Sequence, residues 1–105
     1  MTTAPDIEIF YAEICGLCHK AKDYFHSRGL PFRAREVFWN EAAQEFVDSE
    51  NTREMYRRCG AKVDFVPQMF INGRHIPGWR TLEPMIKSGE IERILYPPAG
   101  GASAA

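Results

Sequence analysis

The chain of 105 residues has only three cysteines, no long hydrophobic run and almost no excess charge of either sign. So few cysteines argue against the disulfide framework of a small secreted domain. No segment approaches the roughly 18 apolar residues of a membrane span, and residues 1–6 do not read as a signal peptide. A net charge of −1 does not indicate the excess of positive charge that attracts nucleic acid or an anionic membrane surface. We therefore expect a cytoplasmic protein with neither kind of partner.

The chain does contain enough apolar material for a core. Hydrophobic residues make up 45% of it, including seven Phe, four Tyr and two Trp. A chain of this length forms one small domain. We assign that domain to residues 1–96, and we expect the Pro- and Gly-rich segment 97–105 to be a disordered C-terminal tail.

Two of the cysteines belong to the motif Cys15-Gly16-Leu17-Cys18, which follows an apolar run and opens a helical pattern. Cysteines at this spacing can close a tight, reducible disulfide, and the N-terminus of a helix favours the thiolate of the outer one. The thiolate is the nucleophile in disulfide exchange. The pattern therefore indicates thioredoxin-type redox chemistry, with Cys15 as the nucleophile and Cys18 as the resolving thiol.

Two structural interpretations of the motif compete with this one. A structural zinc site takes four ligands, usually in two close pairs, but the third cysteine is the isolated Cys59 and the histidines form no second pair. A structural disulfide is disfavoured because so short a loop constrains the unfolded chain weakly. We therefore expect no required metal. Cys59, near a helix end, is either a buried small hydrophobe or an accessory thiol.

The hydrophobic pattern predicts the element order β-α-β-α-β-β-α. The expected elements are strands at 6–12, 32–38, 65–71 and 74–76, and helices at 16–28, from 40 onward and from 81 onward. Asn72-Gly73 predicts a hairpin turn between the last two strands. This order implies an α/β, thioredoxin-like fold in which helices flank a mixed four-stranded sheet.

Two helix starts are predicted from capping residues. Asn40 is expected to cap a helix that contains Ala42, Ala43, Phe46 and Val47. The pattern leaves open whether that helix continues to Arg58 or breaks at 48–52, with Thr52 capping a second piece. Thr81 is expected to cap the last helix, with Pro84 in its first turn. One more helical turn is expected around residues 91–95.

Over residues 6–90 the chain resembles the glutaredoxin family of the thioredoxin superfamily, in its dithiol CxxC type. The resemblance rests on the CxxC motif with the helix after it, on residues 28–32, and most specifically on the stretch VPQMFINGRHIPG at 66–78. It implies a thiol–disulfide oxidoreductase that reduces protein disulfides or glutathione mixed disulfides through the Cys15–Cys18 couple. It also implies a role in electron transport and cell redox homeostasis.

The resemblance further implies a groove for a thiol peptide or glutathione beside the motif. A cis Pro67 would lie against the cysteines and expose the backbone of Val66 to the bound peptide. The residues expected in this groove are Tyr11, Val66, Pro67, Gly78, Trp79 and Arg80. His19 and Lys22 are interpreted either as cations near the thiolates or as solvated surface residues.

Three positions depart from the family pattern that holds glutathione. Ala12 stands where a Lys is usual, Phe65 stands where a Thr is usual, and residues 77–81 replace a Gly-Gly-Cys-Asp/Ser-Asp stretch. Each change removes a group that would hold a charged end of glutathione, so glutathione is a candidate reductant and not a certain one. The stretch Gly78-Trp79-Arg80 resembles that of NrdH-type redoxins, which are reduced by thioredoxin reductase.

Two other functions stay open at the level of sequence. Gly16 replaces a Pro common in dithiol glutaredoxins and, by resemblance, permits a [2Fe-2S] cluster between two monomers, with Cys15 as a ligand alongside glutathione. The second open function is that of a thioredoxin-like adaptor, a binding module in which the cysteines take no part. We expect a monomer whose partners are disulfide-containing proteins and whose electron donor is glutathione or thioredoxin reductase.

Overall fold

Ten helices and strands follow one another along residues 4–97, the part of the chain described by this computed structural model. They are β1 (Ile7–Tyr11), α1 (Gly16–Ser27), β2 (Arg33–Glu36), β3 (Trp39–Asn40), β4 (Glu45–Phe46), α2 (Glu50–Cys59), β5 (Gln68–Ile71), β6 (Arg74–Pro77), α3 (Trp79–Ser88) and α4 (Glu90–Leu95). None of these helices has the length and apolar character needed to cross a membrane. The tail expected at 97–105 lies, apart from its first residue, outside the described residues.

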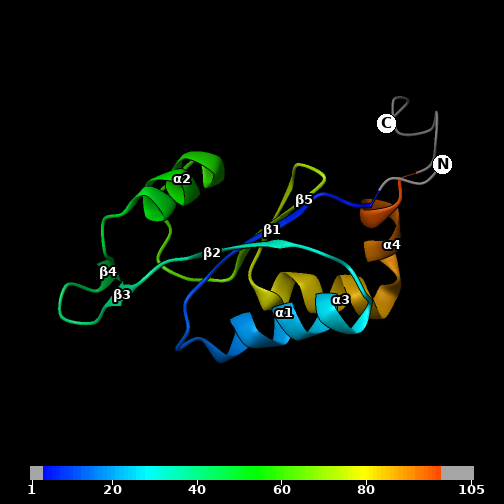
Figure 1. Ribbon diagram of the computed structural model, residues 1–105, viewed down its shortest axis with the longest axis horizontal. Coiled ribbons are helices and arrows are strands. Elements are labelled where there is room, and N and C mark those ends of the chain that lie inside the picture. Colours follow the sequence, from blue (N-terminus) through cyan, green and yellow to red (C-terminus); the bar gives the residue numbers. More distant parts are fainter. Residues whose placement is uncertain (1–3, 98–105) are drawn as a thin grey trace.

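The central sheet has four strands in the order β2-β1-β5-β6 (Figure 1). β1 pairs with β2 in parallel, with α1 as the crossover, whereas β1–β5 and β5–β6 pair antiparallel. Between β5 and β6, Asn72 and Gly73 take φ values of 50° and 85°, the left-handed values that a two-residue hairpin turn requires. The predicted mixed sheet, the hairpin and the fold class are confirmed.

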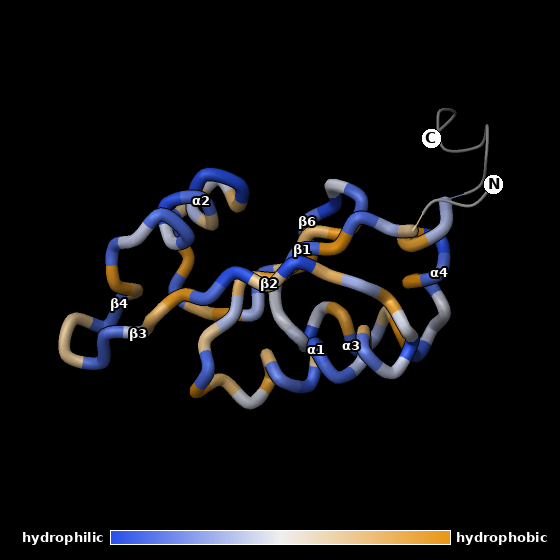
Figure 2. The backbone as a smooth tube through the Cα atoms, in the orientation of Figure 1, coloured by the Kyte–Doolittle hydropathy of each residue, from blue (hydrophilic) through white to orange (hydrophobic). Residues whose placement is uncertain are grey.

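Side chains of the sheet alternate between two cores, one on each face. Ile7 and Ile9 point into the larger core, under α1, α3 and α4, and Phe10 points into the smaller one, under α2. The larger core also contains Phe25, Met69, Ile71, Ile76, Leu82 and Ile91. The smaller one contains Val37, Phe46, Met55 and Phe70. Figure 2 shows α2 as largely hydrophilic, because it buries only Thr52 and Met55.

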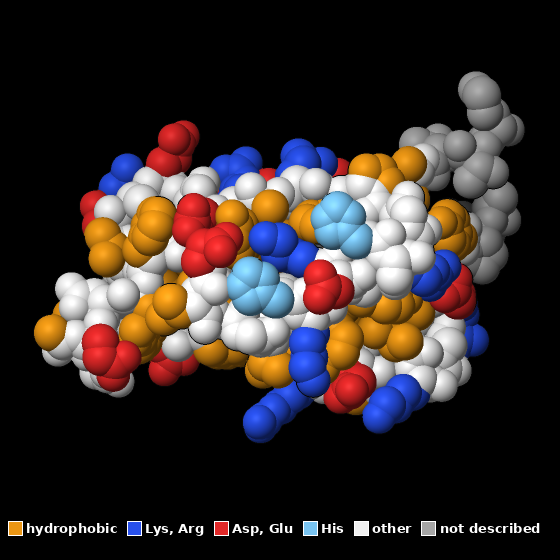
Figure 3. All heavy atoms as spheres, turned by 60° about the horizontal axis from the view of Figure 1, so that its bottom comes forward, with side chains coloured by type: hydrophobic (Ala, Val, Ile, Leu, Met, Phe, Trp, Pro, Cys, Tyr) orange, Lys and Arg blue, Asp and Glu red, His pale blue; other side chains and the backbone are white. Residues whose placement is uncertain are grey.

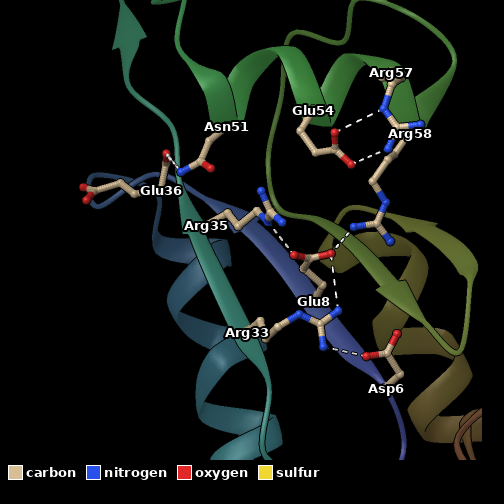
Figure 4. A network of polar contacts seen from close by, with 9 residues as sticks. All are labelled: Asp6, Glu8, Arg33, Arg35, Glu36, Asn51, Glu54, Arg57 and Arg58. Atoms are coloured by element: carbon tan, nitrogen blue, oxygen red, sulfur yellow. Dashed lines mark hydrogen bonds and ion pairs between the residues drawn. The ribbon is translucent and has the colours of Figure 1, made fainter.

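A buried carboxylate joins α2 to the sheet. Glu8, on the α2 face of β1, is 2% exposed and accepts hydrogen bonds from Arg35 of β2 and Arg58 of α2. A guanidinium nitrogen of Arg33 lies 3.5 Å from it (Figure 4). Burial by itself would raise the pKa of Glu8, but the bonds from Arg35 and Arg58 outweigh it and lower that pKa below its usual value of 4.5. The ionised carboxylate is thus the form that holds these elements together.

The helix predicted to start at Asn40 is wrong in its first half. Residues 39–46 form the β3–β4 hairpin, in which the Trp39 and Phe46 rings pack edge to face at 4.9 Å. Asn40 does act as a cap, but of the hairpin turn, where its side chain accepts from the N–H of Ala43. The helix begins only at α2, whose N-cap Ser49 accepts from the N–H of Thr52. The break that the pattern left open therefore falls before residue 50.

The start of the last helix also differs from the prediction. Gly78, with φ 85°, is the N-cap of α3, and Thr81 lies inside the helix, where its hydroxyl donates to the carbonyl of Pro77. Pro84 consequently lies in the helix interior and not in its first turn. The additional turn expected around 91–95 is present as α4.

Candidate active site

The first turn of α1 presents Cys15. Its φ of −91° and ψ of 110° are those of an N-cap, and its Sγ accepts a hydrogen bond from the N–H of Cys18 at 3.2 Å. Its own N–H donates to the carbonyl of Ala12 at 3.0 Å, which closes the turn between β1 and α1. Free amides and the positive end of the helix dipole stabilise negative charge at this position. Cys15 Sγ therefore lies at the start of the helix, where it accepts an amide hydrogen bond.

Cys18 lies one turn further along and has different surroundings. Its side chain is fully buried, with 0% exposure. Burial raises the pKa of this thiol, and hydrogen bonding with the Cys15 side chain raises it further, while the Ala12 backbone and Lys22 lower it less. Both cysteines are free thiols in this structure. The surroundings of Cys18 therefore favour its protonated form, and it lies behind the half-buried Cys15.

The loop before β5 lies against Cys15. The Val66–Pro67 peptide bond is cis, as the resemblance predicted. The Cys15 thiol donates to the carbonyl of Val66 at 3.4 Å. The side chain of Gln68 is fully buried, and its amide donates to the carbonyl of Phe65 at 3.0 Å. This hydrogen bond holds the loop at residues 65–67 against the protein interior. The cysteine pair and the cis-proline loop thus form one continuous surface.

Two cavities open on either side of the Phe65–Val66 backbone. The larger, of about 420 Å³, is lined by Leu17, Phe65, Val66, Pro77, Gly78, Trp79 and Arg80. The smaller, of about 200 Å³, is lined by Ala12, Ile14, Cys15, Trp39, Phe46, Asp64, Phe65 and Val66. Cys15 lines the smaller cavity, and the loop that accepts its hydrogen bond separates the two.

The structure brings together four of the six residues expected in the groove. Val66, Gly78, Trp79 and Arg80 line the larger cavity, whereas Pro67 is buried and Tyr11 lines neither cavity.

The cation near Tyr11 is held by that ring. The Lys22 ammonium lies 3.9 Å from the centroid of Tyr11. Burial raises the pKa of the Tyr11 phenol, with Glu36 and Glu13 adding to the rise. His19 Nε2 lies 2.7 Å from the carbonyl oxygen of Glu13. Tyr11 thus contacts Lys22 and lines neither cavity, and its role in binding a thiol peptide stays a prediction.

This arrangement matches that of known proteins. The glutaredoxin family model matches residues 7–76. The chain belongs to the glutaredoxin family. Glutaredoxin 3 of Escherichia coli K12 is 32% identical over 90 residues, which cover 86% of this chain and 96% of that protein.

Solved structures agree with this membership. The dithiolic glutaredoxin 2-C-Grx1 of Trypanosoma brucei brucei has a TM-score of 0.64 at 26% identity and covers 86% of each chain. A buckwheat glutaredoxin–glutathione complex has a TM-score of 0.63 at 22% identity and covers 87% of this chain and 76% of the other, and it shares the fold. Membership in the family makes this chain a glutaredoxin-like thiol–disulfide oxidoreductase.

Sequence reasoning missed three apolar residues that line the cavity at Cys15 in this glutaredoxin, namely Ile14, Trp39 and Phe46. Ile14 is 82% exposed, and Phe65, which was expected at the groove, is 46% exposed. Trp39 and Phe46 reach the site from the β3–β4 hairpin. The available signal was the large aliphatic residue directly before Cys15, in a loop where no helical or strand periodicity calls for it.

Cys59 lies away from the other two cysteines. At the end of α2 its Sγ is 3.6 Å from both Gln68 Oε1 and His75 Nε2, and burial raises the pKa of its thiol. It is half-buried and packs against the smaller core, which favours the interpretation as a small hydrophobe over that as an accessory thiol.

The site offers no complete set of metal ligands. Within residues 4–97 no three His, Cys, Asp or Glu side chains are grouped so as to hold a metal ion. A cluster at Cys15 would need its other ligands from outside this chain. The described residues do not by themselves fit a resident metal.

Proposed function

We propose that this glutaredoxin reduces protein disulfides by a dithiol mechanism, with Cys15 as the nucleophile and Cys18 as the resolving thiol. The contrast between the two sulfur atoms carries the proposal. The Cys15 sulfur lines a cavity and accepts an N–H bond at the helix start, whereas the Cys18 sulfur is fully buried. The accessible sulfur attacks first, and the buried one can reach only its neighbour.

The reaction then has two exchange steps. The Cys15 thiolate attacks one sulfur of the substrate disulfide; the substrate S–S bond breaks, and the second substrate sulfur leaves as a thiolate that takes up a proton. Cys18 then loses its proton and attacks Cys15 Sγ. That step breaks the bond between Cys15 and the substrate sulfur it attacked, which leaves as a thiolate and takes up a proton, and it forms the Cys15–Cys18 disulfide. The two cysteines give up two electrons to the substrate, and the protons that the two substrate thiolates take up balance those lost when the two cysteine thiols ionise.

The surroundings of Cys18 differ between the two steps. Burial is the largest cause of the raised pKa of Cys18 and persists throughout, and the hydrogen bond and charge of Cys15 add to the rise. Because Cys15 carries no charge in a mixed disulfide, we expect its contribution to fall, which makes ionisation of Cys18 easier in the second step.

Glutathione is the first candidate for returning the electrons, and this chain is expected to hold it weakly. The buckwheat neighbour was solved with glutathione. Here Ala12 offers no cation, and Arg80 is an exposed cation where the family has acidic groups. The Phe65 ring lies over Gly78, so close that a Cβ at residue 78 would stand 3.3 Å from it. These differences remove partners for both charged ends of glutathione.

Thioredoxin reductase is the second candidate donor, because Trp79 and Arg80 of the NrdH-like stretch form one wall of the larger cavity. A monomer in the cytoplasm, where thiols are kept reduced, suits either donor. Cys15 also remains the candidate ligand for a [2Fe-2S] cluster shared with a second copy, and visible absorbance after anaerobic reconstitution would be its signature.

The test compares the two donors with one substrate. Reduction of insulin disulfides is followed with glutathione plus glutathione reductase, and separately with thioredoxin reductase, each with NADPH. We expect turnover with at least one donor, and half-saturation by glutathione at a higher concentration than for Escherichia coli glutaredoxin 3 assayed in parallel. Absence of turnover with either donor, at concentrations where the reference is active, would refute the proposed function.

A further inference from the structure

The β3–β4 hairpin lies at the end of the molecule where α1 begins (Figure 1). Its two strands are only two residues long, and the Trp39–Phe46 ring contact at 4.9 Å joins them. Phe46 is buried in the smaller core, which anchors the hairpin, while Trp39 is half-buried. Its backbone does not extend the central sheet. The hairpin is thus a separate feature built beside the reactive thiol.

The hairpin forms one wall of the cavity that contains Cys15. Trp39 and Phe46 line it on one side, and Ile14 and Phe65 line it on others. Asp64 is the one charged residue among its lining residues. Figure 3, which turns the α1 side forward, shows hydrophobic side chains gathered at the hairpin end of the molecule. A group bound to Cys15 Sγ therefore lies next to an apolar hollow.

Exposed apolar surface at this place has an energetic cost in water. Ile14 and Phe65 flank the nucleophile at 82% and 46% exposure. Contiguous exposed apolar surface marks interaction sites in soluble proteins. Glutathione has charged ends and no apolar side chain to cover it, whereas a protein substrate brings the residues next to its own cysteine.

We propose that this cavity is a subsite for an apolar side chain that flanks the reacting cysteine of a protein substrate. The proposal rests on the dithiol function proposed above and specifies its substrate class. A cavity of about 150 Å³ with apolar walls holds a benzene molecule, so the 200 Å³ beside Cys15 has room for one Leu- or Phe-sized side chain. The carboxylate of Asp64 in the cavity wall would repel an acidic substrate residue placed in this cavity.

The test uses peptide disulfides and no external reductant, so the identity of the electron donor does not enter. Disulfide-linked homodimers of one short peptide carry Leu, Ser or Asp on both sides of the single cysteine. Each is mixed with the reduced protein, and formation of the Cys15–Cys18 disulfide is followed by acid quench and mass spectrometry. Each peptide homodimer yields two peptide thiols per protein oxidised.

We expect the Leu peptide to oxidise the protein about tenfold faster than the Ser peptide, because partial burial of one Leu side chain is worth about that factor, and the Asp peptide to be slowest. Ile14→Ser, at a position that is 82% exposed and makes little contribution to folding, should reduce the Leu-to-Ser ratio towards one. Trp39→Ala should do the same from the hairpin side. Phe38→Ser is the matched control, since Phe38 is 54% exposed in the same segment but lines neither cavity.

The two proposals fail in different ways. If all three peptides oxidise the protein at the same rate, or if the preference for Leu persists in both Ile14→Ser and Trp39→Ala, the subsite is refuted while the dithiol function stands. If Phe38→Ser removes the preference as well, the effect does not belong to the cavity, and the subsite is again refuted. If no peptide oxidises the protein, the dithiol function fails and the subsite fails with it.

Discussion

The backbone N–H of Cys18 donates to the Sγ of Cys15 at 3.2 Å, while the thiol of Cys18 is itself fully buried. The amide of one residue thus contacts the sulfur of the other, while its own sulfur is withdrawn from solvent. Because both features arise within the first turn of α1, we expect the local fold to set the order in which the two cysteines react.

Alkylation of the reduced protein should follow this order. We expect a brief exposure to iodoacetamide at neutral pH to modify Cys15 first. Cys18 and Cys59 should react slowly, because burial raises the pKa of both thiols. Peptide mass spectrometry measures the order, and the urea-unfolded protein, in which all three cysteines react, is the control. Modification of Cys18 as fast as Cys15 would contradict the assignment of roles.

Single replacements of the two cysteines should have different consequences. Cys15→Ser is expected to abolish all exchange. Cys18→Ser should stop the reduction of protein disulfides and accumulate a mixed disulfide at Cys15, because no second protein thiol resolves it. Reduction of glutathione mixed disulfides should survive in Cys18→Ser, since glutathione can resolve that intermediate. If Cys15→Ser is as active as the wild type, the motif is not the active site.

Restoring the missing charges should improve the use of glutathione. Ala12→Lys with Arg80→Asp returns a cation and an anion near the positions where the family has them. Each charge-assisted hydrogen bond is worth about 1.5–3 kcal/mol, so regaining one lowers the KM for glutathione by at least about tenfold. Steady-state kinetics with glutathione and its reductase provide the measurement.

The control for this pair makes the same charge changes elsewhere, as Ala61→Lys with Arg93→Asp, at two exposed positions that line neither cavity. It should leave the KM unchanged. Wild-type protein that already saturates at low glutathione, or a slower rate in Ala12→Lys with Arg80→Asp, would show that this interpretation of the groove is wrong.

The sequence predicted the central sheet well because its signals are local. Asn72-Gly73 is a strong signal for a tight hairpin turn, and the short apolar run at 6–12 is typical of a buried strand. The β3–β4 hairpin had no comparable signal. Ala42 and Ala43 are good helix formers, but they lie in an exposed turn because the Trp39–Phe46 contact pairs the residues on either side. A contact between side chains seven positions apart overrode local propensity.

The reactive cysteines could be found from their spacing, whereas the walls of the site could not. Val66, Gly78, Trp79 and Arg80 were expected from the resemblance, and they do line one cavity. Trp39 and Phe46 line the other only because the hairpin folds beside Cys15, and such a placement depends on tertiary packing. Tyr11 was also expected at the groove from the resemblance; its ring contacts Lys22 and lines neither cavity, so its role stays a prediction.

Replacing Glu8 should weaken the attachment of α2 to the sheet. Glu8→Gln removes the charge that Arg35 and Arg58 bind, at a cost of about 1.5–3 kcal/mol in the free energy of unfolding. The pKa of Glu8 is lowered in the folded state, so its contribution is present above the usual value of 4.5 and is lost as the pH falls from there through the folded-state pKa. Urea unfolding at pH 7 and pH 3.5 measures both effects. A loss equal at the two pH values would contradict this account.

His75 should give the protein a second pH dependence, at higher pH. The imidazole stacks on Phe70 at 4.8 Å, and its Nε2 lies 2.6 Å from Gln68 Oε1. An amide oxygen only accepts, so Nε2 carries the proton and donates. Burial lowers the pKa of His75 below its usual value of 6.5. As the pH falls through that value, the unfolded chain takes up a proton before the folded chain does, and stability is lost until the folded-state pKa is reached.

Urea unfolding between pH 7.5 and 5 should therefore show a decline in stability that His75→Gln flattens. This window lies above the range in which Glu8 titrates, so the two effects are measured separately. His26→Gln is the control, because His26 lies on the exposed side of α1. Its replacement should leave the decline in stability between pH 7.5 and pH 5 as it is in the wild type. Since Gln68 also holds the carbonyl of Phe65, a loss of the Gln68–His75 bond should loosen the loop against Cys15. An unchanged pH dependence in His75→Gln would show that the imidazole takes up its proton as readily in the folded state as in the unfolded chain.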